Sequence, residues 1–295
     1  MSTWVLLRGL MRESRHWGSF PDLLRSSLPG ARVVAIDLPG NGTLFQQRSP
    51  TRVRDMVEHC RRTLRAQGWA PPYHLLALSL GGMVAVAWEH EYPDEISAAV
   101  LLSTSMRPYS PFYQRLRPAN YPALLRMALG PREPLRDEPV ILRITSRQPD
   151  QPEVLRAWVE YARECPVSRA NALRQLLAAA RYAALPGPRQ GRFLLLAGAR
   201  DQLVDPDCSA QLAQAWQADL AIHPQAGHDL PLDAGPWVAA QVLDWLRQHP
   251  TDLSLAIMAR PARQASLPSA AQTAFSNKKA WRDMTLVDGE WKTGK

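Results

Sequence analysis

Six short apolar runs recur along the chain, and stretches with the hydrophobic spacing of amphipathic helices separate most of them. Runs that are apolar throughout are typical of strands in a parallel sheet that is covered on both faces. The alternation predicts an α/β fold with a mostly parallel sheet of about six strands, and the first run already includes Trp4. The runs lie near Trp4, Val33, Leu75, Ala98, Phe193 and Leu220, and the helical patterns near Phe20, Val53, Met83, Ser209 and Trp237.

The periodicity changes between the fourth and fifth runs. Residues 107–189 show helical spacing only, broken by proline-rich turns. We therefore expect a core formed by residues 1–106 and 190–249, with residues 107–189 inserted as a separate helical segment. From residue 250 onward, proline, alanine, serine and glutamine interrupt any periodicity, which predicts a flexible C-terminal tail over residues 250–295.

One serine stands where an apolar run meets an apolar helical pattern. Ser79 follows the run over residues 73–78, and Gly81 opens the helical stretch. A sharp strand-to-helix turn needs small residues two positions before and after its apex, because the two backbones approach closely there. Ala77 and Gly81 meet this need, and a helix N-terminus behind the serine favours developing negative charge. A buried strand that merely ends in serine is the alternative.

Two polar residues follow the last two apolar runs of the core. Asp201 comes after the fifth run and His228 after the sixth. Because the carboxyl ends of parallel strands meet at one edge of a sheet, we expect both to lie near Ser79. Histidine can take and return a serine proton near neutral pH, and a carboxylate can fix its tautomer. Asp205 and Asp207 are rival acids, although the proline after Asp205 also suggests a helix N-cap.

These features resemble the α/β-hydrolase fold family. Residues 77–81, Ala-Leu-Ser-Leu-Gly, match its small-x-Ser-x-Gly nucleophile elbow, with alanine as a mild departure from the first glycine. The order Ser79, Asp201, His228 is the order of that family's catalytic triad. Residues 37–42, Asp-Leu-Pro-Gly-Asn-Gly, match its Asp-x-Pro-Gly-x-Gly turn. The resemblance implies that residues 107–189 are the family's helical cap or lid.

The resemblance also implies an oxyanion hole made of two backbone N–H groups. Leu80, directly after the serine, supplies one, and Leu10, after the first strand, supplies the other. Arg8 stands where many relatives carry histidine, and two roles stay open for it: hydrogen bonds to loop carbonyls, or positive charge near the acyl end of a substrate. We interpret the other histidines as structural or surface groups, and among them we single out His16 for comparison with the site.

Charge is spread unevenly along the chain. Of the formal net charge of +8, about +7 lies in residues 107–189, which hold 14 arginines and 7 acidic residues. Such a patch attracts anionic ligands, although arginines on solvated helix faces explain it equally well. No basic run, zinc-ligand spacing or aromatic-interleaved stripe favours nucleic-acid binding. Every lysine lies in the tail, at Lys278, Lys279, Lys292 and Lys295.

Other motifs narrow the classes further. The odd number and spacing of Cys60, Cys165 and Cys208 indicate neither a disulfide framework nor a metal site, and we expect no cofactor. The chain shows no signal-peptide pattern and no apolar stretch long enough to cross a membrane. We therefore expect a cytoplasmic protein with no integral membrane association, and the oligomeric state is left open.

The expected activity is that of a serine hydrolase. Ser79, Asp201 and His228 would cleave a carboxylic ester or thioester of a small-molecule acyl substrate through an acyl-enzyme, with Leu10 and Leu80 holding the oxyanion. Serine at the elbow disfavours family members with an aspartate nucleophile, such as haloalkane dehalogenases and epoxide hydrolases. The alternatives are a carbon-carbon bond hydrolase or lyase with the same triad, and a catalytically idle receptor of the same fold.

Overall fold

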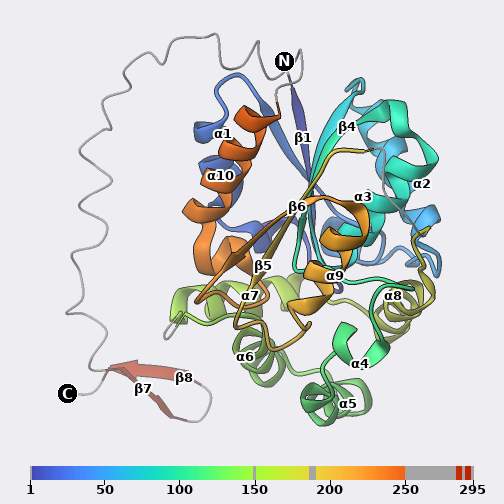
Figure 1. Ribbon diagram of the computed structural model, residues 1–295. Coiled ribbons are helices and arrows are strands. Elements are labelled where there is room, and N and C mark those ends of the chain that lie inside the picture. The colour runs from blue at the N-terminus through green and yellow to red at the C-terminus, as the bar shows by residue number, and fades with distance from the viewer. Residues whose placement is uncertain (1, 149–150, 186–190, 250–283, 288–289, 294–295) are drawn as a thin grey trace, which may run out of the picture. The chain divides into compact units, whose positions relative to one another are not determined.

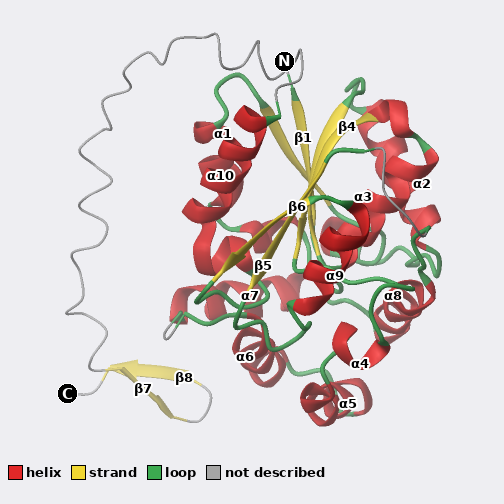
Figure 2. Ribbon diagram, viewed as in Figure 1, coloured by secondary structure: helices red, strands yellow, loops and turns green. Residues whose placement is uncertain are grey.

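A computed structural model describes residues 2–148, 151–185, 191–249, 284–287 and 290–293. It divides into two compact units, Met1–Ile257 and Met258–Lys295, and each is described by itself. The first unit is built around a six-stranded sheet with the order β2-β1-β3-β4-β5-β6, in which every neighbouring pair is parallel (Figures 1 and 2). This confirms the predicted sheet. Its strands are β1 Thr3–Leu7, β2 Arg32–Ile36, β3 Tyr73–Leu78, β4 Ile96–Leu102, β5 Phe193–Gly198 and β6 Asp219–His223.

Helices cover both faces of the sheet, which is why its central strands are apolar throughout. Strand β1 is buried at all five positions. Trp4 and Leu6 join the apolar cluster on the face of α1 and α10, whereas Val5 and Leu7 join the cluster on the face of α2, α3 and α9. The sequence therefore shows no polar alternation along this strand. These helices are α1 Phe20–Ser27, α2 Val53–Ala66, α3 Leu80–Glu91, α9 Asp207–Trp216 and α10 Leu230–Gln248.

The strand order creates a crevice at one edge of the sheet. The chain begins at β1 inside the sheet, moves outward to β2, and then returns to the other side of β1 to form β3. The loops after β1 and β3 therefore diverge, and ligands of open parallel sheets bind at such a switch point beyond the carboxyl ends of the strands. Gly9 follows β1 and Ser79 follows β3, so both lie at this point.

The segment between β4 and β5 contains helices and no strand in its described residues, as the periodicity of residues 107–189 predicted. In Figure 1 these helices gather at the carboxyl end of the sheet. We call residues 107–189 the insertion; its standing as a separate domain and as a lid stays a prediction. Its α-helices are α4 Phe112–Arg115, α5 Tyr121–Leu129, α6 Pro134–Thr145, α7 Pro152–Glu164 and α8 Arg169–Arg181, and the short 3-10 helix Pro118–Asn120 precedes α5.

The second unit contains two antiparallel strands, β7 Met284–Val287 and β8 Glu290–Thr293. The expected flexible tail falls largely on residues 250–283, which lie outside the described residues, so it stays a prediction. Within the described ranges, no helix has both the length and the apolar character needed to cross a bilayer.

Candidate active site

Ser79 occupies the turn between β3 and α3 in a backbone conformation that non-glycine residues rarely adopt, with φ 55° and ψ −115°. Such a conformation costs of order 1–3 kcal/mol and persists only where the surroundings hold it. Its N–H donates to the carbonyl of Leu102 at 2.9 Å. Its own carbonyl accepts from the Gly82 N–H at 2.9 Å and from Thr104 Oγ1 at 2.8 Å. The turn is therefore fixed on both sides of the serine.

Small residues make this turn possible, as the sequence predicted for Gly81. A Cβ at Gly81 would lie 2.4 Å from the carbonyl oxygen of Leu7, so any side chain there would collide with the backbone of β1. Gly9 also lies close, since a Cβ there would be 3.2 Å from the Ser79 Cβ. Helix α3 begins at Leu80, so the Leu80 N–H is one of the four at the helix start that lack an intrahelical acceptor.

His228 and Asp201 are joined in the interior. His228 Nδ1 lies 2.7 Å from Asp201 Oδ2, and the two side chains are only 4% and 2% exposed. The other carboxylate oxygen, Asp201 Oδ1, accepts the N–H groups of Leu203 and Val204 at 2.8 and 3.0 Å. Asp201 is thus held by backbone donors while it orients the imidazole.

The rival acids have other partners. Asp205 pairs with Arg117, whose Nη2 lies 3.1 Å from Asp205 Oδ2, and Asp205 Oδ1 accepts the Asp207 N–H at 3.1 Å. Asp205 therefore supports the start of α9, although Pro206 and not Asp205 is the residue directly before the helix. Asp207 itself is exposed at the start of α9.

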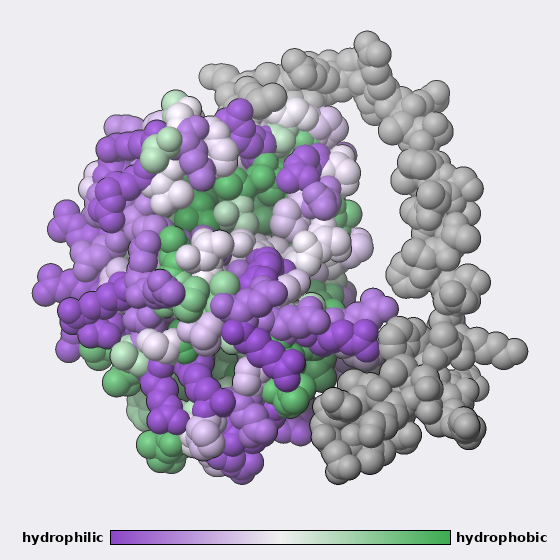
Figure 3. Space-filling view, turned by 180° about the vertical axis from the view of Figure 1, so that it is seen from behind, coloured by the Kyte–Doolittle hydropathy of each residue, from purple (hydrophilic) through white to green (hydrophobic). Residues whose placement is uncertain are grey.

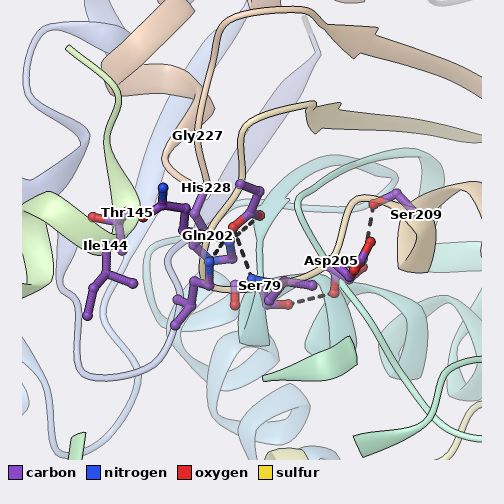
Figure 4. Close-up of polar contacts among 12 residues, drawn as sticks. Ser79, Ile144, Thr145, Gln202, Asp205, Ser209, Gly227 and His228 are labelled. Carbon is purple, nitrogen blue, oxygen red and sulfur yellow. Dashed lines mark hydrogen bonds and ion pairs between the residues drawn. The ribbon is translucent and has the colours of Figure 1, made fainter. Parts of the chain in front are cut away.

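Ser79 and His228 line one cavity of about 2040 Å³, and Leu10 and Leu80 line it as well. Figure 4 shows Ser79 and His228 in a close-up of this region, with Thr145 of the insertion beside the loop that contains Gly227. Four of the five site residues that the sequence predicts therefore line one cavity, and the fifth, Asp201, is hydrogen-bonded to His228. Most of the remaining wall comes from the insertion.

Arg8 forms an ion pair that sequence reasoning did not anticipate. Its Nη1 and Nη2 donate to Asp229 Oδ1 and Oδ2 at 3.1 and 2.6 Å, and both side chains are 3% exposed. The guanidinium also lies over the Trp17 ring, 4.8 Å from its centroid. Arg8 thus binds neither loop carbonyls nor solvent through these atoms. It joins the loop after β1 to the residue that follows His228.

The end of α6 holds the histidine loop from the other side. The Asp229 N–H donates to the Thr145 carbonyl at 2.8 Å. Asp233 Oδ2 accepts the N–H groups of Gly227 and Arg147, at 2.7 and 2.9 Å. Burial is the main cause that raises the pKa of Asp233, and these donors partly oppose it. The insertion is therefore bonded directly to the loop that carries His228.

Gln175 of α8 holds the loop after β1, and sequence reasoning missed it. Its side chain is fully buried, and its Oε1 accepts the Met11 N–H at 2.8 Å. Its Nε2 donates to Asn41 Oδ1 at 2.7 Å and to Ser49 Oγ at 3.1 Å. A glutamine within a helical pattern looks like a surface residue, so no signal in the sequence marks it.

His16 also lines the cavity and is almost fully buried. Its Nδ1 faces the Glu13 N–H at 3.2 Å, and Arg12 Nη1 lies 3.1 Å from its Nε2. Burial first, and then the positive charges of Arg12 and Arg8, lower the pKa of His16 well below its usual value. His16 is thus a neutral wall residue at pH 7. Among the described residues, no three His, Cys, Asp or Glu side chains gather in a way that could hold a metal ion.

Comparison with known proteins agrees with the fold. The model of the alpha/beta hydrolase family matches residues 4–241. One similar structure is a putative lipase from Acinetobacter baumannii, with 23% identity, a TM-score of 0.68 and coverage of 84% of each chain. An esterase from a Rhodococcus species has 18% identity and a TM-score of 0.68, over 83% of this chain and 90% of its own.

A third similar structure is 2-hydroxy-6-oxo-6-phenylhexa-2,4-dienoate hydrolase from Rhodococcus sp. strain RHA1. It is 21% identical with a TM-score of 0.68, over 83% of this chain and 90% of its own. At these identities the likeness concerns the fold alone. An uncharacterized protein of Bacillus subtilis is 27% identical over 75 residues, and this match spans 25% of this chain and only 23% of the length of that relative.

Proposed function

The chain belongs to the alpha/beta hydrolase family, and we propose that it is a serine hydrolase that cleaves a carboxylic ester or thioester through an acyl-enzyme. One observation carries the proposal. His228, bonded through Nδ1 to the buried carboxylate of Asp201 at 2.7 Å, lines the same cavity as Ser79, which is held at the apex of a strained turn. Such a constellation serves proton transfer between a hydroxyl nucleophile and a leaving group.

The proposed reaction has two halves. Ser79 Oγ attacks the acyl carbon while His228 Nε2 takes its proton, and the N–H groups of Leu10 and Leu80 stabilise the oxyanion. The bond to the leaving oxygen or sulfur then breaks, and His228 returns the proton to that atom. Water repeats the sequence on the acyl-enzyme and releases a carboxylic acid. Asp201 keeps the proton-bearing Nδ1 of His228 in place throughout.

Covalent labelling by a fluorophosphonate tests the nucleophile. The folded protein should be labelled at Ser79, and Ser79→Ala should abolish the label. Ser103→Ala is a matched control, because Ser103 is also a buried serine at positive φ directly after a strand but does not line the cavity. Failure of the folded wild-type protein to react would overturn the proposal and favour a binding protein of the same fold.

Kinetics with short neutral esters test the other two members. Ser79→Ala or His228→Ala should lower kcat by several orders of magnitude, on the order of 10⁶-fold in a comparable triad, and Asp201→Ala somewhat less. Asp205→Ala is the control for the acid, because its carboxylate pairs with Arg117. A silent Asp201→Ala together with an inactive Asp205→Ala would contradict the assignment. A protein that labels at Ser79 but cleaves no ester or thioester would point to carbon-carbon bond cleavage.

A further inference from the structure

The cavity at Ser79 is far larger than a short ester requires. Its volume of about 2040 Å³ exceeds the roughly 300–1,000 Å³ of ordinary small-molecule sites. Apolar side chains of the insertion form much of its wall. Burial of each methylene of a ligand against such a wall is favourable. The cavity therefore fits a ligand with a long apolar chain. The wall includes Leu124, Met127, Ile141, Ile144 and Leu176.

The apolar character continues to the outer rim of the cavity. Phe112, Leu125, Leu129 and Leu173 line it and are 73%, 58%, 73% and 67% exposed. Figure 3 shows hydrophobic residues among hydrophilic ones in its lower part, the level at which Figure 1 shows the insertion helices. A chain could thus contact apolar surface along the whole path from the rim inward.

Every carboxylate in the wall already has a cationic partner. The wall contains five acidic side chains, and an arginine lies within ion-pair distance of each. Among the described residues, the cavity wall therefore has no acidic side chain without a cationic partner. The pairs are Glu13 with Arg15, Glu133 and Asp137 with Arg136, Glu138 with Arg12, and Asp229 with Arg8.

Five arginines in the wall, by contrast, have no carboxylate partner among the described residues: Arg107, Arg115, Arg132, Arg163 and Arg169. Arg115 Nη2 donates to the Ala179 carbonyl at 2.7 Å, whereas its Nε is buried without any partner.

Two of these arginines, Arg115 and the more exposed Arg132, have lowered pKa values. Burial is the main cause that lowers the pKa of Arg115, and nearby Arg107 lowers it further. Burial likewise lowers the pKa of Arg132; the next largest influence, Asp137, opposes this shift, and Arg169 adds to it. Each pair sets two positive charges near each other, and a bound anion would relieve their repulsion. At the first pair an anion would also supply an acceptor for the unpartnered Nε of Arg115.

We propose that the substrate is an anionic amphiphile: an acyl ester or thioester whose long apolar chain lies in the cavity and whose carboxylate or phosphate group is bound by the wall arginines. This inference rests on the proposed hydrolysis at Ser79. The anion can belong to the acyl part or to the leaving group, because the arginines recognise the same chemistry in either case. Arg107 with Arg115, and Arg132 with Arg169, are the two candidate positions for it.

Three chromogenic octanoyl-length esters separate these cases. 4-Nitrophenyl octanoate is neutral, the mono-4-nitrophenyl ester of octanedioic acid carries the anion on the acyl part, and 4-nitro-3-octanoyloxybenzoate carries it on the leaving group. For one of the two anionic esters, Arg107→Gln/Arg115→Gln or Arg132→Gln/Arg169→Gln should lower kcat/KM about tenfold or more, mainly through KM. For the neutral ester, kcat/KM should change less than twofold in either variant.

A chain-length series tests the apolar part of the site. In neutral 4-nitrophenyl esters with acyl chains of four to ten carbons, kcat/KM of the wild-type protein should rise two- to fourfold per methylene.

Arg126→Gln/Arg143→Gln is the matched control. It also removes two positive charges from the insertion, one from α5 and one from α6, but neither side chain lines the cavity. An equal loss in this control would mean that only the general field of the insertion acts, and would overturn the proposed site. So would unchanged kcat/KM for both anionic esters in both wall variants, or a chain-length series without a rise.

A binding measurement keeps this inference separate from the proposed hydrolysis. Isothermal titration of the Ser79→Ala protein with decyl phosphate and decanol, below their aggregation concentrations, should show at least tenfold tighter binding of decyl phosphate. The preference should disappear in one wall double variant. Equal affinities would overturn the anionic site even if Ser79 hydrolyses neutral esters. A clear preference in a protein that fluorophosphonate never labels would instead retain the anionic site and reject the hydrolysis.

Discussion

Removal of the Asp229 carboxylate should weaken both the stability of the protein and the proposed hydrolysis. The carboxylate forms two hydrogen bonds with Arg8, at 3.1 and 2.6 Å, and both side chains are 3% exposed. Asp229→Ala would leave a buried guanidinium without its counterion, and Arg8 Nε already has no partner. Breaking a buried pair in this way costs about 3–5 kcal/mol. At roughly 2–4 °C per kcal/mol for a domain of this size, Tm should fall by about 6–20 °C.

The effect on activity should appear in kcat. Arg8 precedes Gly9 at the loop that carries Leu10, and Asp229 directly follows His228, so the pair fixes the two loops relative to each other. A displacement of about 1 Å in a catalytic group can cost on the order of 10²-fold in rate. We therefore expect Asp229→Ala to lower kcat on a short neutral ester by about 10- to 100-fold, with a smaller change in KM. The assay is run well below the melting temperature of the variant.

Two comparisons show whether the lower kcat of Asp229→Ala arises from displaced loops or only from lower stability. Arg61 and Glu95 form another two-point pair, at 2.8 and 2.8 Å, but Glu95 lies at the amino end of β4, away from the cavity. Glu95→Ala should lower Tm and leave kcat unchanged. Arg8→Met/Asp229→Leu should regain much of the lost stability, because apolar residues replace both charges, yet keep the low kcat. Full recovery of kcat in that double variant, or a wild-type kcat in folded Asp229→Ala, would refute the positioning role.

Two further predictions concern the core. Burial, and to a lesser degree Arg192, lowers the pKa of His74 to about 4. Below about pH 6.5 the unfolded chain therefore binds a proton at His74 that the folded protein does not bind. The free energy of unfolding should fall as the pH drops from 6.5 to 4, by up to about 3 kcal/mol. Urea titrations at pH 7 and 5 should show this loss reduced in His74→Phe, and an unreduced loss would contradict the assignment. Gly81→Ala should destabilise the protein by about 1–3 kcal/mol and lower kcat, because its Cβ would lie 2.4 Å from the Leu7 carbonyl oxygen. Gly235→Ala, with 3.4 Å to the nearest side-chain atoms, is the control that should keep both.

Local patterns were sufficient to predict the strands, most helices and the residues at the strand ends. Each of the six apolar runs forms a strand, and Gly81 lies where only a residue without a side chain fits. These features depend on short-range rules: apolar runs form buried strands, helical spacing forms covering helices, and tight turns need small residues. The polar residues that follow these strands then lie at one edge of the sheet, because parallel strands end at the same edge.

Long-range pairing was outside the reach of such rules. Arg8 and Asp229 are 221 residues apart, and Gln175 meets Met11 across 164 residues. In the sequence, Arg8 was compatible with two roles and Gln175 looked like a helix-surface residue. Whether such a side chain faces solvent or a buried partner depends on how the insertion packs against the loops of the core, and no local pattern encodes that.

The sequence by itself therefore determined the α/β architecture and the order of Ser79, Asp201 and His228, because strand propensity, turn sterics and parallel topology act over short stretches. The tertiary structure alone decided which acid meets the histidine. It also decided which arginines remain unpaired in the cavity wall and which residues hold the two loops in place. These outcomes follow from burial and from the distances between charges on separate segments, quantities that exist only once the insertion has packed over the carboxyl edge of the sheet.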